Sequence, residues 1–375
     1  FLFPMNALPN DRPFYLLNED KIIANLARLQ QVKDATGCTI LMALKAFSHY
    51  QVFPLIAQTL DGCTASSLHE ARLAHDYFPG HHHAYSPAYS PRDFPEWTEY
   101  SQTITANSLQ QVAFLQNLST QKSLEIGLRI NPLQREASNP LYDPSSPQSR
   151  LGVIAKHLKN QWPKGVTGLH MHNLCENDSH SLERTIESIE RDASFALEVC
   201  EWINLGGGHM ISQRDYDLDH LIQLIDHLQK TYSLRVILEP GAAVVWEAGN
   251  LHAHVLDIVA QDEVATALLD VSITAHMPDC IEMPYTPQVR EGRITDKGCR
   301  YRLGGNSCLA GDFVGDYHFE HGLFIGDEVV FLDMAHYTTV KTHFFNGVHH
   351  PSVYLQHTDG SYTCLKTFDY TDYQS

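Results

Sequence analysis

The sequence predicts an α/β protein made of a (β/α)8 TIM barrel and an all-β domain. From about residue 20, segments with helical apolar spacing alternate with short apolar runs, a pattern typical of parallel strands covered by helices. Eight such runs fit a closed barrel in both number and chain length. After about residue 252, the pattern changes to short alternating strands separated by turn residues.

The elements of the barrel follow in order. The first helix is expected over residues 21–32, where Ile22, Leu26 and Leu29 form one apolar stripe. Helices are also expected over residues 68–77, 109–118, 182–200 and 218–232. The eight expected strands cover residues 39–44, 63–65, 83–85, 103–106, 125–130, 168–172, 202–205 and 236–238.

The second domain is expected to contain strands over residues 252–260, 266–274, 292–303, 328–334 and 352–355. Asp359-Gly360 predicts a hairpin turn after the last of these strands. Residues 14–17 form another apolar run that can join this domain. We therefore predict a barrel over residues 20–250 and a discontinuous β-sandwich or β-barrel domain formed by residues 1–19 and 251–375.

Composition limits the class of function. The formal net charge of -18 argues against a nucleic-acid partner. The eight cysteines include no CxxC pair, which favours reduced thiols in a cytosolic protein and argues against a cysteine metal site. The absence of a long apolar stretch and of a signal-peptide pattern predicts a cytoplasmic protein without a membrane partner.

Polar residues follow several of the predicted barrel strands. Active sites of TIM barrels lie at the carboxyl ends of the strands. Each residue alone has an ordinary explanation, such as a solvated lysine, a core histidine or a flexible glycine turn. Their joint placement at one end of a barrel favours an active site, formed by Lys45, Ser66-Ser67, Arg129 with Asn131, His172, Gly206-Gly207-Gly208 and Glu239-Pro240-Gly241.

These residue types suit one cofactor. A desolvated Lys45 loses its proton readily, and its free amine attacks carbonyl carbons. The glycines free backbone N–H groups for a phosphate, with help from the helix that follows them. Glu239 can hold a protonated pyridine nitrogen, and His172 can lie against an aromatic ring. Aldehyde, phosphate and pyridinium together describe pyridoxal 5'-phosphate.

The sequence resembles the alanine racemase-like, fold-type III pyridoxal-phosphate decarboxylases over nearly its whole length. The motifs that carry the resemblance are Ala43-Leu44-Lys45-Ala46, Gly168-Leu169-His170-Met171-His172-Asn173, Leu205-Gly206-Gly207-Gly208, Glu239-Pro240-Gly241 and Cys308-Leu309-Ala310-Gly311-Asp312. Within this family, His172-Asn173-Leu174-Cys175-Glu176 and residues 276–285 are most similar to the carboxynorspermidine decarboxylases. The resemblance implies decarboxylation of carboxynorspermidine or carboxyspermidine in polyamine biosynthesis.

The resemblance also implies the roles of individual residues. Lys45 would bind the cofactor covalently, His172 would stack on its ring, and Glu239 would pair with the ring nitrogen. The phosphate would be bound by Gly206, Gly207, Gly208 and Tyr337, and Arg129 and Arg150 match basic positions near the cofactor. Ala242 departs from the family pattern, because relatives commonly carry a charged residue there.

Cys308 resembles the thiol that returns a proton to the substrate, which places it with Lys45 and His172 in the catalytic set. Cys308 and Asp312 would come from the other subunit, so the resemblance implies a homodimer with shared active sites. A polyamine substrate also needs carboxylates for its distal amines. The candidates are Asp279, Glu282, Asp312 and Asp316.

Three other interpretations remain. The His81-His82-His83 run suggests a zinc hydrolase, but three successive residues of a strand cannot all face one ion, and no metal site is expected. A non-catalytic pyridoxal-phosphate-binding relative is disfavoured by Cys308 and Asp312. Ornithine, lysine or meso-diaminopimelate as the substrate is disfavoured by the segment after His172.

Overall fold

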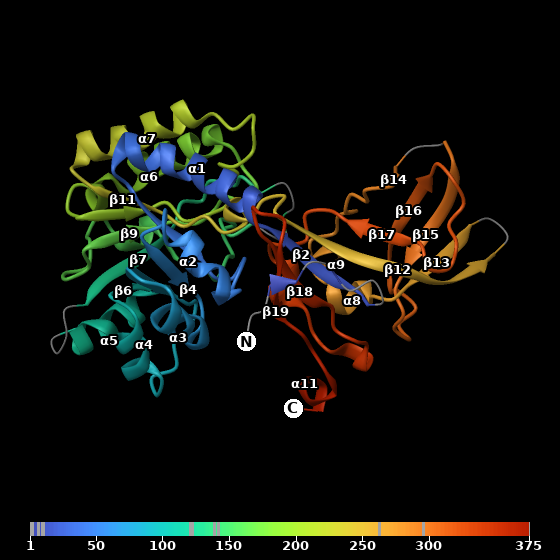
Figure 1. The fold of residues 1–375 in the computed structure, drawn as a ribbon. Coiled ribbons are helices and arrows are strands. Elements are labelled where there is room, and N and C mark those ends of the chain that lie inside the picture. Colours follow the sequence, from blue (N-terminus) through green and yellow to red (C-terminus); the bar gives the residue numbers. More distant parts are fainter. Residues whose placement is uncertain are drawn as a thin grey trace. The chain divides into compact units, whose positions relative to one another are not determined.

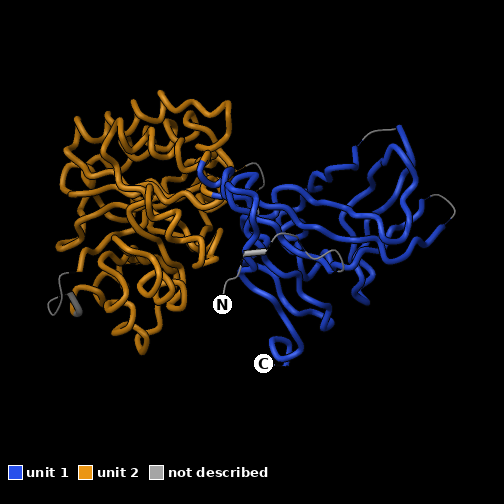
Figure 2. Tube along the Cα trace, viewed as in Figure 1, with its two compact units in different colours: residues 1–23, 245–375 blue, residues 24–244 orange. Residues whose placement is uncertain are grey.

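The computed structural model describes residues 4–5, 8, 12–119, 124–137, 140, 143–261, 264–294 and 297–374. The chain divides into two compact units (Figure 2). One unit is Ala24–Val244, and the other combines Phe1–Ile23 with Val245–Ser375.

The unit Ala24–Val244 is a closed parallel barrel. Its eight strands are β3 (Thr39–Ala43), β4 (Gly62–Ala65), β5 (His81–Tyr85), β6 (Thr103–Ala106), β7 (Glu125–Asn131), β9 (Gly168–His170), β10 (Trp202–Asn204) and β11 (Arg235–Leu238). Each strand pairs in parallel with the next one in this order, including β6 with β7 and β7 with β9. The last strand, β11, pairs with the first, β3, so the ring is complete. A short strand, β8 (Val153–Ile154), pairs in parallel with the end of β7.

Helices lie on the outside of the barrel strands (Figure 1). They are α1 (Glu19–Thr36), α2 (Phe53–Ile56), α3 (Leu68–Tyr77), α4 (Phe94–Tyr100), α5 (Leu109–Ser119), α6 (Ser179–Leu197) and α7 (Leu218–Tyr232). Side-chain caps fix where the longer helices begin, because they satisfy N–H groups that have no partner inside the helix. Asp178 accepts from Ser181 N at the start of α6, and Asp217 accepts from His220 N at the start of α7.

The side chain of Trp202 in the barrel core requires glycine at two neighbouring positions. Trp202 is fully buried, and its indole occupies the space beside β7 and β9. A Cβ atom on Gly168 would lie 1.9 Å from the indole, and one on Gly127 would lie 2.5 Å from it. Since interiors are close-packed, glycine at these two positions is what allows the large ring to fill the barrel.

The second unit is built mainly of strands. They are β1 (Pro4–Met5), β2 (Phe14–Asn18), β12 (Gly249–Ala260), β13 (Ala265–Leu269), β14 (Gly292–Arg293), β15 (Cys299–Gly304), β16 (Phe313–Phe319), β17 (Glu328–Phe331), β18 (Ser352–Gln356) and β19 (Tyr362–Lys366). Their order is β1-β19-β18-β2-β12-β13-β15-β16-β14, and β17 pairs with β12. Short helices accompany them: α8 (Ile273–His276), α9 (Asp279–Glu282), α10 (Thr338–Lys341) and α11 (Tyr370–Gln374).

The predicted fold class is confirmed, and all eight predicted barrel strands are present. The N-terminal run joins the second unit as β2, between β12 and β18, and the hairpin predicted at Asp359-Gly360 joins β18 to β19. Several predicted strands of this unit were wrong in extent. The strand expected over 292–303 is two strands, the one over 266–274 ends at Leu269, and β16 and β19 were missed.

None of the helices in the described part of the chain has the length and apolar content needed to span a bilayer.

Candidate functional site

Lys45 and His172 lie side by side at the carboxyl end of the barrel. Lys45 follows β3, and His172 lies two residues past the end of β9. The backbone N–H of Gly207 donates to His172 Nδ1 at 2.9 Å, so a neutral ring carries its proton on Nε2. That Nε2 is 3.2 Å from Lys45 Nζ. Because Nε2–H can only donate, this contact is a hydrogen bond when Lys45 is an uncharged amine.

The electrostatic surroundings favour the same protonation states. Although the Lys45 side chain is accessible to solvent, protein atoms surround it closely, and burial followed by the nearby Arg129 lowers its pKa. Burial, then Lys45 and Arg129, hold the pKa of His172 well below its usual range. A neutral imidazole beside an uncharged lysine is the arrangement that makes the amine nucleophilic.

Glu239 lies at the end of β11 and is buried as a carboxylate. It accepts hydrogen bonds from His83 Nδ1 and, at 2.7 Å, from Asn204 Nδ2. Burial alone raises the pKa of Glu239, but His83, together with His170 and Asn204, outweighs this effect and lowers it. Asn204 also accepts from Gly206 N at 2.8 Å, which fixes its amide orientation and joins Glu239 to the glycine loop.

The loop Gly206-Gly207-Gly208 requires glycine at each position. A Cβ atom would lie 2.6 Å from His172 Nδ1 at Gly206, 2.3 Å from Glu239 O at Gly207 and 2.1 Å from Leu174 O at Gly208. Gly206 and Gly208 also have positive φ angles of 69° and 85°. The N–H groups of Gly206 and Gly207 donate within the protein, whereas that of Gly208 has no acceptor among the described residues.

The helix expected to help the glycines bind a phosphate begins only at Leu218, and Asp217 caps it. Its first turn therefore does not directly follow the loop. Of the three loop N–H groups, only that of Gly208 is left without an acceptor among the described residues.

Arg129 and His170 complete the surroundings of the site. Arg129 Nη2 donates to His172 O at 2.7 Å, and its guanidinium lies 4.7 Å from the centre of the Tyr85 ring. His170 is buried, and neither of its ring nitrogens has a hydrogen-bond partner among the described residues. Its Nε2 is 3.8 Å from Glu239 Oε2.

These residues fit pyridoxal phosphate. One connected network holds a lysine amine with a lowered pKa for an aldehyde, a neutral imidazole, a buried carboxylate for a pyridinium nitrogen and a glycine loop for an anion. The lysine and imidazole are in contact at 3.2 Å, and the imidazole and loop at 2.9 Å. The carboxylate residue is joined to the loop through its backbone, because Glu239 N donates to Gly206 O at 2.8 Å.

The candidate residues Cys308 and Asp312 belong to the second unit. Cys308 is exposed, and its backbone N–H donates to Asn346 Oδ1 at 2.7 Å. Asp312 is buried and accepts from Thr274 N at 2.9 Å and from Ser307 N at 3.1 Å. Asp312 thereby fixes the loop that carries Cys308.

The other three candidate carboxylates all have cationic partners within the second unit. Lys341 Nζ lies 2.6 Å from Asp279 Oδ1 and 2.8 Å from Glu282 Oε2. Asp316 pairs with two arginines on β15, Arg300 at 2.5 Å and Arg302 at 2.8 Å. A substrate ammonium would therefore have to replace or supplement these cations.

Tyr337 has an unusual backbone conformation, with φ 51° and ψ -47°. Thr338 N donates to His336 O across it, which makes a γ-turn of the rare, strained kind. Such strain often marks a functional position. Ala242 begins a short 3-10 helix after Gly241, and Arg150 is exposed on a loop of the barrel unit.

Sequence reasoning missed three residues that organise these sites. Strand alternation places His81 and His83 on one face of β5 and His82 on the other, so a barrel-facing His83 could have been found. No local pattern pairs it with Glu239, which is 156 residues away. Asn204 and Lys341 likewise act through residues distant in sequence.

Residues 14–335 match the family model described as pyridoxal-dependent decarboxylase, C-terminal sheet domain. The chain is 42% identical to the carboxyaminopropylagmatine decarboxylase of Synechocystis sp., with 100% of this chain and 98% of that protein covered. It is 39% identical to the carboxynorspermidine/carboxyspermidine decarboxylase of Campylobacter jejuni, with 96% and 97% covered.

The fold agrees with the same group of proteins. The crystal structure of carboxynorspermidine decarboxylase from Campylobacter jejuni, complexed with norspermidine, superposes with a TM-score of 0.89. It is 38% identical, and the match covers 97% of this chain and 99% of that one.

Proposed function

Because the chain belongs to the pyridoxal-dependent decarboxylase family, we propose that it decarboxylates carboxynorspermidine and carboxyspermidine in polyamine biosynthesis. The products are CO2 and norspermidine or spermidine. The observation that carries the proposal is the contact of Lys45 Nζ with His172 Nε2 in a chain that matches a decarboxylase of these substrates over its whole length. We take the barrel, residues 20–250, as the cofactor-binding domain.

Pyridoxal phosphate, when bound, supplies an electron sink for the pair of electrons that the departing carboxylate leaves behind. Lys45 would hold the cofactor through its uncharged amine. His172 would pack against the ring, and Glu239 would hold the ring nitrogen in its protonated form because its own pKa is low. The glycine loop, with Tyr337, would bind the phosphate. Arg129 positions His172 by donating a hydrogen bond to the backbone carbonyl of His172.

Decarboxylation replaces the carboxylate on the α-carbon with a proton. We propose that the Cys308 thiol donates this proton, since the thiol lies on an exposed loop held by Asp312. Following the family resemblance, Cys308 and Asp312 would serve the active site of a second copy of the chain. The working enzyme would then be a homodimer in the cytoplasm.

The distal amines of the substrate need negative partners. Asp279 and Glu282 share one lysine, so an incoming ammonium can compete with Lys341 for them. Asp316 is held by two arginines and is the less available carboxylate. Asp312 would contribute from the partner copy.

A second candidate substrate is carboxyaminopropylagmatine, favoured by the 42% identity to the Synechocystis enzyme named for it. Agmatine ends in a guanidinium, whereas carboxynorspermidine ends in an amine. A guanidinium forms paired hydrogen bonds with a carboxylate, which an ammonium does not.

The test is CO2 release by the purified enzyme with pyridoxal phosphate. Carboxynorspermidine, carboxyspermidine, carboxyaminopropylagmatine, ornithine, lysine and meso-diaminopimelate are offered separately, and kcat/KM is compared. Highest values for the two carboxylated triamines support the proposal. Preference for carboxyaminopropylagmatine would select the second candidate, and preference for an amino acid would overturn both.

A further inference from the structure

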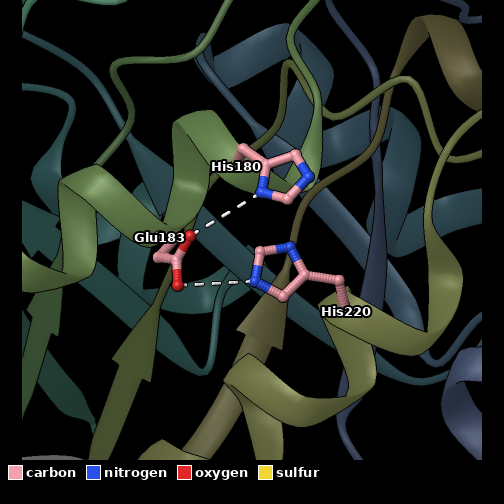
Figure 3. Close-up of side chains that lie close together, drawn as sticks. All are labelled: His180, Glu183 and His220. Carbon is pink, nitrogen blue, oxygen red and sulfur yellow. Dashed lines mark ion pairs between the residues drawn. The ribbon is translucent and has the colours of Figure 1, made fainter.

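A cluster of three metal-ligand side chains lies on two neighbouring helices of the barrel unit. His180 and Glu183 project from the first turns of α6, and His220 projects from the first turn of α7 (Figure 3). His180 Nδ1 is 3.7 Å from Glu183 Oε2, and His220 Nε2 is 3.6 Å from Glu183 Oε1. All ligand atoms of the cluster lie within 4.8 Å of one another.

A hydrogen bond from outside the cluster holds one of its histidines in place. His220 Nδ1 lies 3.0 Å from the hydroxyl of Ser179, which is fully buried. With Nδ1 occupied, Nε2 is the nitrogen that faces Glu183. Histidine ligands of metals are oriented in this way by a partner on the second ring nitrogen.

The distances suit a small tetrahedral ion. Zinc lies about 2.0–2.2 Å from nitrogen and oxygen ligands, so ligand atoms at the corners of a tetrahedron are roughly 3.3–3.6 Å apart. His180 and His220 face different oxygens of Glu183, at 3.7 and 3.6 Å, so the exposed carboxylate must turn and the ligand atoms must draw closer for one oxygen to complete the set. The side chains of His180 and Glu183 are 58% and 43% exposed, which leaves them free to adjust.

Charge also permits a cation at this place. Helix N-termini carry partial positive charge and oppose a cation. Glu183 and the capping residues Asp178 and Asp217 supply negative charge at the same two helix ends.

The position of the cluster gives it a consequence for the active site. Helix α6 follows the segment that carries His172, and α7 follows the glycine loop. These two segments already touch, because Asn177 N donates to Gly208 O at 2.9 Å. We propose that His180, Glu183 and His220 bind one divalent transition-metal ion of the zinc class, which joins α6 to α7 and stabilises the two loops.

Cobalt(II) provides the direct test, because its visible absorption reports tetrahedral coordination. Holoenzyme dialysed against EDTA and then against buffer is titrated with Co2+, and Zn2+ is added as the competitor. We expect one equivalent of tetrahedral Co2+ per chain, displaced by Zn2+. His180→Ala should abolish this signal, and Ser179→Ala should weaken binding by about 10–100-fold through loss of the supporting partner.

The chain offers a matched control in the pair His227 and Glu190, which joins the same two helices at 2.6 Å and has no third His, Cys, Asp or Glu ligand among the described residues. His227→Ala should keep full Co2+ binding. Zn2+ should raise the Tm of the parent and of His227→Ala but not of His180→Ala. Absence of a tetrahedral signal in the parent, or an equal signal in His180→Ala, would overturn the proposal. Neither result bears on the decarboxylase assignment, because each is read without substrate.

Discussion

His83 donates a hydrogen bond to Glu239 inside the barrel, where the two residues are 0% and 7% exposed. This contact, together with those of His170 and Asn204, outweighs burial and lowers the pKa of the Glu239 carboxyl. Thr105 lies 2.7 Å from the other ring nitrogen of His83 and fixes its orientation. We regard His83 as a positioning residue for Glu239.

Replacing His83 tests this role. His83→Leu removes a hydrogen bond to a charged group, worth about 1.5–3 kcal/mol, so kcat should fall by about 10–150-fold with little change in KM. His83→Gln retains a side-chain donor and should restore much of the loss. His82→Gln is the control, because His82 lies on the outer face of the same strand and contacts Phe78 O. Equal losses in His82→Gln and His83→Leu would refute the role.

Lys45→Ala should abolish turnover and the visible absorption band of the lysine-linked cofactor, because no other amine lies beside His172 Nε2 in the described barrel. Lys45→Arg keeps a cation but offers no uncharged amine, so it should also be inactive. Absorbance spectra and CO2 release measure both effects. Substantial turnover by either variant would contradict the assignment.

Cys308→Ala should lower kcat by about 10²–10⁴-fold, the usual contribution of a proton donor, while cofactor affinity stays the same. In D2O the parent should place deuterium on one face of the product α-carbon, and Cys308→Ala should lose this stereospecificity. Cys299→Ala is the matched control, since Cys299 is also exposed in the same unit. An unchanged rate in Cys308→Ala would remove its role.

Gly207→Ala would place a Cβ atom 2.3 Å from Glu239 O and force the glycine loop away from β11. We expect a loss of about 1–3 kcal/mol in stability and weaker cofactor binding. Gly311→Ala, where a Cβ would meet nothing within 4 Å, controls for the added methyl group. Thermal unfolding and cofactor titration compare the two variants, and equal behaviour would disprove the close contact.

Lowering the pH should begin to destabilise the protein near pH 6.5, before the carboxylates start to take up protons near pH 4. Burial lowers the pKa of His209 to about 4 and that of His276 to about 3. Near pH 6.5 these histidines become protonated in the unfolded chain but stay neutral in the folded protein. Their contribution to the free energy of unfolding is therefore complete above pH 6.5 and is lost as the pH falls. Between pH 6 and 5, each such histidine adds at most about 1.4 kcal/mol of loss per pH unit.

His209→Asn isolates one of these histidines. Urea unfolding of the holoenzyme at pH 7, 6 and 5 should show a shallower loss of stability in His209→Asn than in the parent. His227→Asn, at an exposed site, should follow the parent. Parallel curves for all three proteins would exclude a buried neutral His209.

The sequence by itself determined the fold class and the end of the barrel that carries the site. Hydrophobic period and strand length are local properties, so Lys45, His172 and Glu239 could be placed at strand ends without coordinates. The second unit was harder to predict, because a two-residue strand such as β14 differs little from a loop in local pattern.

Only the tertiary structure decided which polar groups meet. Closure of the barrel brings His83 to Glu239, and the packing of α6 against α7 brings His220 to Glu183, although 156 residues separate the first pair. Likewise, Lys341 meets Asp279 and Glu282 only because α10 lies close to α9 in the folded unit. Which side chains pair over such separations depends on the path of the whole chain. The local pattern of residue types around each partner therefore cannot predict the pair.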